Sequence, residues 1–271
     1  MPALYVVATP IGNLEDVSLR ALRTLGEAKL IAAEDTRKTK RLLNAYDIKT
    51  PVTSYHEQNK RSKLGYILAK LEEGDVALVS EAGMPGISDP GYELIIAASE
   101  RSVSVVPIPG PSAIITALAI SGLPTNRFTY IGFLPRKSGE RRRRLESVVG
   151  ESGTIIALET PHRLREALGD ILLTLGDRKV ALCRQLTKLH EEVFRGRLSQ
   201  ALEHFTKPRG EFTLVIEGKG EKEKPELTQD IEHKLQRMRS SGVTAKEAVA
   251  KVVEETGLSK RELYRAWLKY S

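Results

Sequence analysis

A group of polar side chains comes immediately after the apolar run Leu30–Ala33. These side chains could transfer protons or bind an anion. They are Glu34, Asp35 and Arg37, with Thr36 between them. Carboxylates can accept protons, and such groups concentrate in the loops that follow strands. The alternative is structural, because Asp35 or Thr36 could cap the next helix while the other charges form ion pairs. The residue types alone leave both interpretations open.

A second candidate is the stretch Ser80–Gly91, in which three glycines and two prolines fall within nine residues. It lies between Val76–Val79, predicted as a buried strand, and Tyr92–Ala98, predicted as a helix. Glycine lets the backbone approach a ligand closely, and proline fixes φ. Rigid loops of this kind present backbone groups to ligands at the carboxyl ends of strands. The alternative is an elaborate turn that holds no ligand.

Alternating strand-like and helix-like segments predict the elements that would position these loops. The first helix is expected at residues 17–26, with Asp16 as its N-cap and Gly26 at its end. A second Gly/Pro loop, Pro109–Ala113, opens a helix through Ile120 that Ser112 would cap. The alternation predicts a largely parallel sheet covered on both faces. Strands are expected at 4–8, 30–33, 52–55, 76–79 and 103–108.

A hinge is predicted at residues 122–126, and a mixed α+β half follows it. Its strands are expected at 128–133, 154–158, 180–185, 191–198 and 212–217. A dense basic segment lies in this half, with only Glu140 as a counter-charge. Such a run repels itself unless phosphates or counter-ions lie nearby, which favours phosphate contact over a solvated helix start. The basic residues are Arg136, Lys137, Arg141, Arg142, Arg143 and Arg144.

Residues 219–225 contain no apolar side chain and are predicted as a linker. A separate helical unit is expected at 226–271. Thr244 with Glu247, and Ser259 with Glu262, form capping-box patterns around the turn at Gly257, the spacing of a helix-turn-helix. The alternative is a protein-contact or capping bundle. The last helix carries Lys260, Arg261 and Arg265.

The composition of the 271 residues is that of a globular protein, with 41% hydrophobic and 28% charged residues. No apolar run approaches the roughly 20 residues of a membrane span, and the N-terminus lacks the pattern of a signal peptide. The single cysteine, Cys183, lies in the apolar run 180–183, which predicts a buried structural thiol. We therefore expect a cytoplasmic protein without disulfide, metal site or membrane segment. The net charge of +7 permits an anionic partner.

Seven motifs in matching order give the chain a family resemblance. It resembles the bacterial 16S ribosomal RNA ribose 2′-O-methyltransferases of the tetrapyrrole-methylase superfamily, which act on a cytidine in the decoding region. The resemblance spans residues 4–218, and the C-terminal unit looks like the helix-turn-helix appended in that family. The motifs are 8–14, 33–37, 80–91, 109–113, 132–136, 159–163 and 209–212.

The resemblance implies a two-domain α/β fold of the tetrapyrrole-methylase type (class III methyltransferase) with a small all-helical helix-turn-helix unit. The domains would be 1–121 and 122–218, with S-adenosyl-L-methionine in the cleft between them, and the enzyme would be a homodimer. Relative to the family loop, Glu81 replaces Asp and Met84 replaces Thr, so no hydroxyl is available at the second position. The cofactor-binding residues implied are Pro10, Ile11, Gly83, Met84, Ile87, Ser112, Ala113, Leu158 and Phe212.

Methyl transfer to a 2′-hydroxyl needs alignment and removal of a proton. We predict Glu34, Asp35 and Arg37 as the catalytic group, because they lie at a strand end beside the implied cleft. The 16S rRNA within the small ribosomal subunit would contact the basic segment, Arg184 and the cations of the last helix. Two alternatives remain: a precorrin-type C-methyltransferase, which would not need the basic segment, and a non-catalytic RNA-binding module, which would need no methyl donor.

Overall fold

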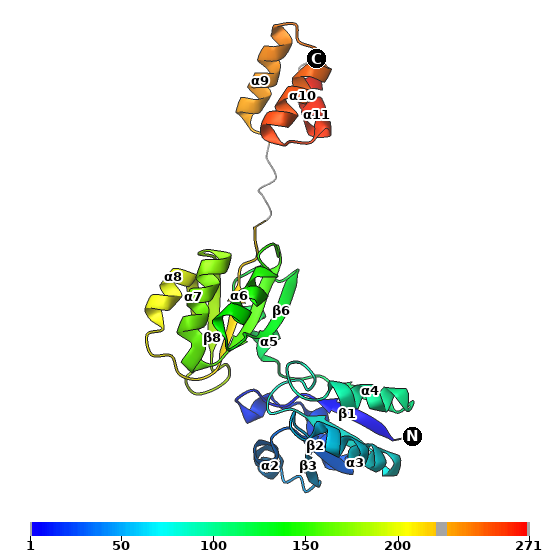
Figure 1. Ribbon diagram of the computed structural model, residues 1–271. Coiled ribbons are helices and arrows are strands. Elements are labelled where there is room, and N and C mark those ends of the chain that lie inside the picture. The colour runs from blue at the N-terminus through cyan, green and yellow to red at the C-terminus, as the bar shows by residue number, and fades with distance from the viewer. Residues whose placement is uncertain (1, 221–226, 270–271) are drawn as a thin grey trace. The chain divides into compact units, whose positions relative to one another are not determined.

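The computed structural model describes residues 2–220 and 227–269 (Figure 1). The chain divides into two compact units, residues 1–218 and 219–271. The predicted linker lies for the most part outside the described residues. Within the described ranges, none of the helices combines the length and the apolar character that a bilayer crossing demands.

The first sheet of the larger unit is entirely parallel, with the strand order β3-β2-β4-β1-β5. Parallel strands bring all of their carboxyl ends to one edge of the sheet, so the loops after β1, β2, β4 and β5 meet there. This edge carries both Gly/Pro loops and Glu34. The strands are β1 (Ala3–Val7), β2 (Leu30–Ala33), β3 (Val52–Ser54), β4 (Val76–Val79) and β5 (Ser104–Ile108).

Helices cover both faces of this sheet, as the alternation predicted. Leu25 of α1 and Leu42 of α2 pack on one face with Val7 and Val79. Residues of α3 and α4 pack on the other face in a second core. Burial of apolar side chains on two faces explains why these strands contain almost no polar residues. The helices are α1 (Leu19–Glu27), α2 (Thr36–Ala45), α3 (Lys60–Glu73) and α4 (Tyr92–Glu100).

The start of α1 differs from the prediction. Asp16 ends a short 3₁₀ turn, η1 (Leu14–Asp16), and Ser18 is the N-cap, accepting a hydrogen bond from the Ala21 amide. Gly26 lies inside the helix, which continues to Glu27. A serine hydroxyl and an aspartate carboxylate are about equally good caps. The prediction chose Asp16 and overlooked Ser18.

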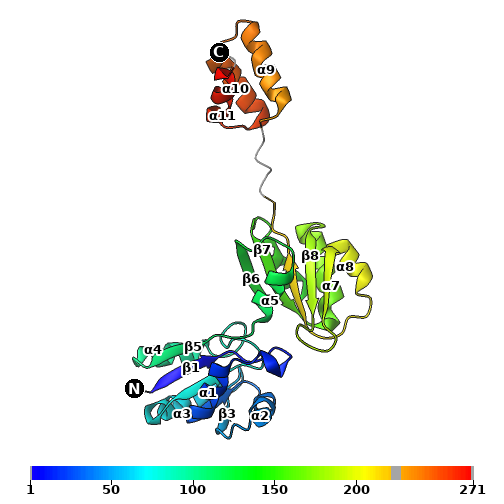
Figure 2. The same cartoon turned by 180° about the vertical axis from the view of Figure 1, so that it is seen from behind.

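The second sheet is mixed, with the order β6-β7-β10-β8-β9. Only β6 and β7 pair in parallel, and the other pairs are antiparallel. One face carries α6, α7 and α8, of which α7 and α8 lie side by side in the view from behind (Figure 2). The strands are β6 (Phe128–Phe133), β7 (Thr154–Glu159), β8 (Lys179–Arg184), β9 (Glu192–Arg197) and β10 (Phe212–Ile216), and the helices are α6 (Ser138–Glu146), α7 (Leu164–Leu175) and α8 (Leu198–His204), with a 3₁₀ turn η2 (Pro161–Arg163) before α7.

The opposite face of the second sheet packs against α5 (Ala113–Ile120). Ala117 and Leu118 of this helix meet Val215 of β10 and Ala181 of β8. The predicted domain boundary after residue 121, which stays a prediction, would assign α5 to the first domain. Because α5 follows the loop at the edge of the first sheet but packs on the second, it joins the two sheets into one unit.

The smaller unit consists of α9 (Gln229–Ser240), α10 (Ala245–Thr256) and α11 (Lys260–Leu268) around a core that includes Leu235 and Trp267. Both predicted capping boxes are present, at Thr244 and Ser259. Gly257 has φ +71° and ends α10 in the left-handed conformation that favours glycine.

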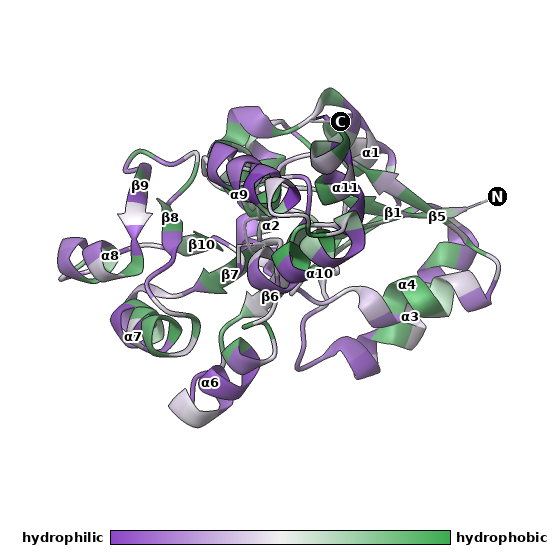
Figure 3. Ribbon diagram, turned by 90° about the horizontal axis from the view of Figure 1, so that it is seen from above, coloured by the Kyte–Doolittle hydropathy of each residue, from purple (hydrophilic) through white to green (hydrophobic). Residues whose placement is uncertain are grey.

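Hydropathy distinguishes the helix of the basic segment from the core strands (Figure 3). The strands β1 and β5 are mostly hydrophobic, whereas α6 is mostly hydrophilic. Two residues of α6, Arg141 and Leu145, are nevertheless buried. The basic segment thus consists of Arg136 and Lys137, which precede α6, and of a helical part with a charged outer surface and one buried arginine.

Candidate active site

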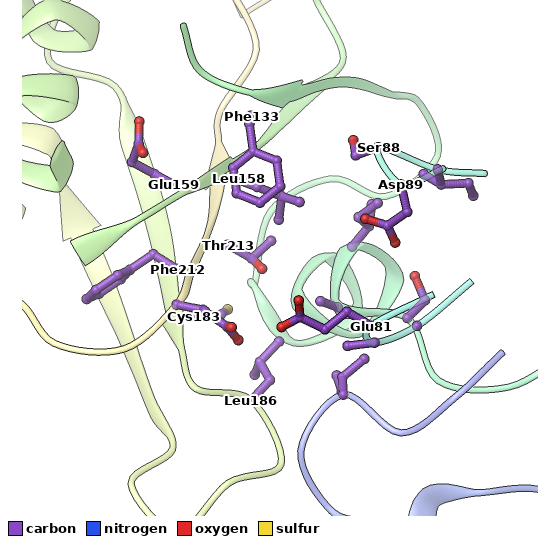
Figure 4. Close-up of a pocket in the computed structure, with 18 of the residues that line it drawn as sticks. Glu81, Ser88, Asp89, Phe133, Leu158, Glu159, Cys183, Leu186, Phe212 and Thr213 are labelled. Atoms are coloured by element: carbon purple, nitrogen blue, oxygen red, sulfur yellow. The ribbon is translucent and has the colours of Figure 1, made fainter. Parts of the chain in front are cut away.

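A cavity of about 420 Å³ lies between the loops at the carboxyl edge of the first sheet and the face of the second sheet. In the close-up, Phe133 and Leu158 lie across the cavity from Ser88 and Asp89 (Figure 4). We call it the first cavity. The residues that line it include Ile11, Glu34, Glu81, Gly83, Met84, Ile87, Asp89, Ser112, Ala113, Phe133, Leu158, Glu159, Cys183, Leu186, Lys188, Glu211, Phe212 and Thr213.

Backbone contacts hold the loops that form one wall of this cavity. Thr9 and Gly83 exchange two amide-to-carbonyl hydrogen bonds of 2.9 Å, which join the loop after β1 to the loop after β4. Gly83 has φ +81°, a conformation that side chains disfavour. Ser88 also has a positive φ, and its hydroxyl lies 2.6 Å from that of Tyr130 on β6. The Gly/Pro loop is therefore fixed to both sheets.

The first cavity is apolar but acidic. Glu34, Glu81 and Asp89 lie on its first-sheet wall, Glu159 and Glu211 on the other, and the only cation that lines it, among the described residues, is Lys188. Glu81, Glu159 and Glu211 are ion-paired with Lys38, Arg163 and Lys188, which leaves Glu34 and Asp89 as the acids without a cationic partner among the described residues. Uncompensated acids beside apolar side chains suit a cationic ligand with an apolar body. S-adenosylmethionine, which carries a sulfonium and an ammonium group, has this character, so the residues present fit the expected cofactor.

Asp89 is a site residue that the sequence did not single out. Burial, with the nearby charge of Glu34, raises its pKa from 3.8 to about 7, although a hydrogen bond from Ser80 opposes the shift. A carboxyl group poised near neutral pH can hold or release a proton under physiological conditions. The sequence could have indicated Asp89 as a site residue only through its position in the stretch Ser80–Gly91, which was already a candidate ligand-binding loop.

The three predicted catalytic residues do not stay together. Glu34 lines the first cavity, and its carboxylate accepts a 2.9 Å hydrogen bond from the Glu81 amide. Asp35 caps α2, accepting hydrogen bonds from the amides of Arg37 and Lys38, of which the first contributes most to lowering its pKa. The side chain of Arg37 is 90% exposed and lines neither this cavity nor its neighbour. The structural alternative thus fits Asp35, and only Glu34 faces the cavity.

Eight of the nine residues implied to bind the cofactor line the first cavity, while Pro10 lies at a neighbouring one. Their contact with a cofactor stays a prediction. The segment Gln185–Lys188 was missed, since it follows β8 without a recognisable motif. Cys183, by contrast, is the buried thiol that was predicted, and burial raises its pKa to about 11.

The neighbouring cavity, here the second cavity, measures about 330 Å³. It shares Ile11, Glu81, Ala82, Lys188 and Glu211 with the first, so the two cavities are contiguous. Lys38 and Arg41 of α2 line it as well, together with the loop after β1. Its cations therefore outnumber its carboxylates.

The structure corrects the predicted role of one arginine in the basic segment. Arg141 is 1% exposed, and its guanidinium donates to Asp170 at 2.7 Å and to the carbonyl of Arg136 at 3.2 Å. Burial raises the pKa of Asp170, but hydrogen bonds from Arg142, Ser138 and Arg141 outweigh it and hold that pKa below its usual value. A buried, fully engaged arginine cannot meet RNA, so its prediction as an RNA contact is wrong.

The other predicted RNA-binding residues lie in several places. Arg184 is half-buried and engaged by the Arg209 carbonyl at 2.7 Å and Glu192 at 2.9 Å. Within the described ranges, no three His, Cys, Asp or Glu side chains are grouped closely enough to hold a metal ion. Exposed side chains belong to Arg136, Lys137, Arg142, Arg143 and Arg144 in the larger unit and to Lys260, Arg261 and Arg265 in the smaller one.

Comparison of the chain with known proteins first defines the class of protein to which it belongs. A family model described as Tetrapyrrole (Corrin/Porphyrin) Methylases matches residues 3–202. Among solved structures, a diphthine synthase is similar with a TM-score of 0.61 at 15% identity, over 79% of this chain and 90% of that one. A uroporphyrin-III-C-methyltransferase from Thermus thermophilus is similar with a TM-score of 0.55 at 20% identity, over 80% and 94%. The predicted fold class is confirmed.

Curated relatives narrow the class. Proteins named ribosomal RNA small subunit methyltransferase I are 49% identical in Halalkalibacterium halodurans, over 97% of this chain and 94% of that one, and 43% identical in Bacillus subtilis, over 98% and 94%. The relative in Thermotoga maritima is 50% identical, and its whole length matches 81% of this chain. The chain belongs to the tetrapyrrole methylases and, within them, to the ribosomal RNA small subunit methyltransferase I family. The enzyme class predicted from the sequence, a methyltransferase, is confirmed.

Proposed function

We propose that the protein transfers a methyl group from S-adenosylmethionine to the ribose 2′-hydroxyl of a cytidine in 16S rRNA of the small ribosomal subunit. The observation that carries the proposal is an acidic, apolar cavity contiguous with a basic one, in a chain 49% identical to a small-subunit rRNA methyltransferase. The acidic cavity suits the donor, and the basic cavity and basic segment suit a polyanionic acceptor. Ribosomes lie in the cytoplasm, which would place the protein there.

When bound, the cofactor supplies a methyl group on a sulfonium sulfur, which an attacking hydroxyl oxygen takes while the sulfur leaves as a neutral thioether. The chain itself has three tasks. The Gly/Pro loops hold the donor through backbone groups, and the apolar wall with Leu158 and Phe212 excludes water. Carboxylates attract the cationic donor and so favour its binding. Positioning supplies much of the acceleration in such a displacement.

Glu34 and Asp89 are the carboxylates that we assign to accept the proton of the hydroxyl group. Both line the first cavity, and neither is ion-paired within the described residues, whereas Glu81, Glu159 and Glu211 each pair with a cation. We expect single-turnover methylation to fall strongly in Glu34→Gln and Asp89→Asn. In Asp35→Ala and Arg37→Ala it should stay close to normal, provided that α2 remains folded. A strong chemical defect in Arg37→Ala, with intact cofactor binding, would instead return that residue to the catalytic group.

The function is tested by incubating the protein with labelled S-adenosylmethionine and either small ribosomal subunits or a tetrapyrrole precursor. Label in 16S rRNA, mapped to a cytidine 2′-oxygen, is expected. Label in the tetrapyrrole would support the small-molecule alternative. Calorimetry with S-adenosylmethionine separates both from a non-catalytic RNA-binding module, which would bind no methyl donor.

We also propose that the smaller unit helps to bind RNA. The Thermotoga relative matches only 81% of this chain over its whole length, a difference close to the size of the unit at 219–271. That difference indicates that the cofactor site does not need the unit, while its exposed cations Lys260, Arg261 and Arg265 suit contact with RNA. Deletion of residues 226–271 should thus weaken binding to small subunits and leave cofactor affinity unchanged. Loss of cofactor binding in the truncated protein would contradict the proposal.

A homodimer is the proposed assembly, following the family resemblance. Exposed apolar side chains on the larger unit, such as Tyr92 and Ile115, are available for a subunit contact. Analytical ultracentrifugation of the full chain should give twice the monomer mass of 30.0 kDa. A concentration-independent monomer would refute this assembly.

A further inference from the structure

We propose that the second cavity binds the phosphodiester backbone of the RNA strand that carries the target nucleotide, with Arg41 as its principal contact and Lys38 and Lys188 beside it. This inference rests on the proposed function, since it assigns the acceptor of the same reaction to a place. It differs from the basic segment of α6, which lines neither the first nor the second cavity.

The position of the cavity suits a strand that must deliver a ribose to the methyl donor. The second cavity opens beside the first and shares with it Ile11 and Ala82 from the loops of the first sheet and Lys188 from the second. A phosphate held in one cavity leaves the adjoining ribose within reach of the other. Fixing the acceptor in this way provides the alignment on which displacement reactions depend.

The charges of the second cavity favour an anion. Lys38 pairs with Glu81, and Lys188 pairs with Glu211 at 2.7 Å. No carboxylate in the described part of the chain lies within ion-pair distance of Arg41, which leaves its planar guanidinium available for bidentate contact with a phosphate. Arg41 is thus the uncompensated charge of this cavity.

Thr9 supplies an independent observation. It borders the second cavity and is 5% exposed, yet its hydroxyl has no hydrogen-bond partner within residues 2–220 and 227–269. Buried hydroxyls in native proteins are nearly always hydrogen-bonded. Because the protein covers this oxygen in the structure, the Thr9 side chain must rotate toward the cavity before a phosphate oxygen can supply the missing partner.

Lys188 is held at the junction of the two cavities by its own loop. The Asn13 amide donates to the Thr187 hydroxyl at 3.0 Å, and the Thr187 amide donates to Glu191 at 2.6 Å. Gly12 makes this contact possible, because a Cβ there would lie 2.5 Å from Cγ of Lys188. A cation carried by the second sheet is thereby fixed against a loop of the first.

The test compares two cations of the same helix. Arg41 lines the second cavity, whereas Lys40 is exposed and lines neither cavity. We expect Arg41→Glu to weaken binding to small ribosomal subunits by about tenfold or more, and Lys40→Glu by much less. In Arg41→Ala the slope of log affinity against log salt should fall by about one, as for the loss of one phosphate contact. Affinity for S-adenosylmethionine should be unchanged in all three.

Arg41→Lys should recover most of the binding, because it restores the charge, and melting temperatures identify any variant that fails to fold. Equal losses in Arg41→Glu and Lys40→Glu, or an unchanged salt slope in Arg41→Ala, would overturn the inference. Failure of the proposed function would show differently, since the unaltered protein would then place no methyl group on small subunits. Normal methylation by the unaltered protein and by Arg41→Glu would refute only the inference.

Discussion

The two contiguous cavities are built in part from the same residues but differ in charge. The first is lined by five carboxylates and one lysine, and the second by three cations and two carboxylates. Glu81, Lys188 and Glu211 belong to both. On the sites that we propose, local charge alone would separate a cationic donor from a polyanionic acceptor within the length of a few side chains.

This separation follows from the elements that supply the charges. Glu34 and Asp89 come from loops after parallel strands, where carboxylates face the first cavity. Lys38 and Arg41 are three residues apart on α2 and therefore lie on one helical face. Arg37 and Lys40 of the same helix line neither cavity. Strand ends thus carry the acids and one helical face carries the bases.

Among the variants that test the difference between the two cavities, a charge reversal in the first cavity should have the largest effect. Asp89→Lys places a cation where the donor cation should lie, so affinity for S-adenosylmethionine should fall by about 100-fold or more in calorimetry. Affinity for small ribosomal subunits should not fall, because the second cavity is intact.

Glu100→Lys is the matched control for that variant. Glu100 is the last residue of α4, at the edge of the sheet opposite the cavities, and the change in net charge is the same. Its donor affinity should match that of the unaltered protein. A similar loss of donor affinity in both variants would show that net charge, and not the carboxylates of the first cavity, governs donor binding.

A substitution at the junction between the cavities should have the second largest effect on binding. A Cβ at Gly12 would lie 2.5 Å from Lys188, 2.7 Å from Thr187 and 3.0 Å from the Leu186 carbonyl. Gly12→Ala must displace this loop, so we expect both donor and RNA affinities to fall by about tenfold, since the loop borders both sites.

Gly26→Ala serves as the control, because a Cβ at Gly26 within α1 meets nothing within 4 Å. Both of its affinities should be normal, and the protein should be slightly more stable, since alanine favours a helix. If Gly12→Ala lowers only the donor affinity or only the RNA affinity, the loop does not border both sites.

Much of this architecture was predictable because local patterns determine it. Strand β2 and the caps at Ser112, Thr244 and Ser259 occur where the sequence placed them. The cofactor-binding prediction reached the first cavity for a similar reason, since loops that follow parallel strands must meet at one edge.

The failures concern side chains whose roles depend on distant partners. Arg141 belongs to a basic run by its sequence, but Asp170, 29 residues away, binds it in the interior. Asp89 gains its altered pKa from burial and from Glu34, which is remote in sequence. Lys188 reaches the cavities through a contact with Gly12. No local pattern encodes such long-range pairs.

The smallest expected effect concerns Asp89 of the first cavity. It tests whether the ionised Asp89 carboxylate destabilises the folded protein before any ligand binds. Because the pKa of Asp89 rises from 3.8 to about 7 on folding, the folded protein binds the proton more tightly, and its stability falls as the pH rises from about 4 to about 7. Asn removes the charge. Asp89→Asn should thus be more stable than the unaltered protein at pH 8 in urea unfolding, by about 1 kcal/mol after allowance for partial exposure.

The advantage should shrink at pH 5 and vanish below the ordinary pKa. Asp47→Asn supplies the opposite case, because a hydrogen bond from Lys49 lowers the pKa of Asp47, whose favourable contribution is present at neutral pH and lost as the pH falls. Asp47 also lies away from both cavities. If Asp89→Asn gains nothing at pH 8, the carboxylate is already stabilised in the free protein, and Asp89 is not a source of strain that a bound cation would relieve.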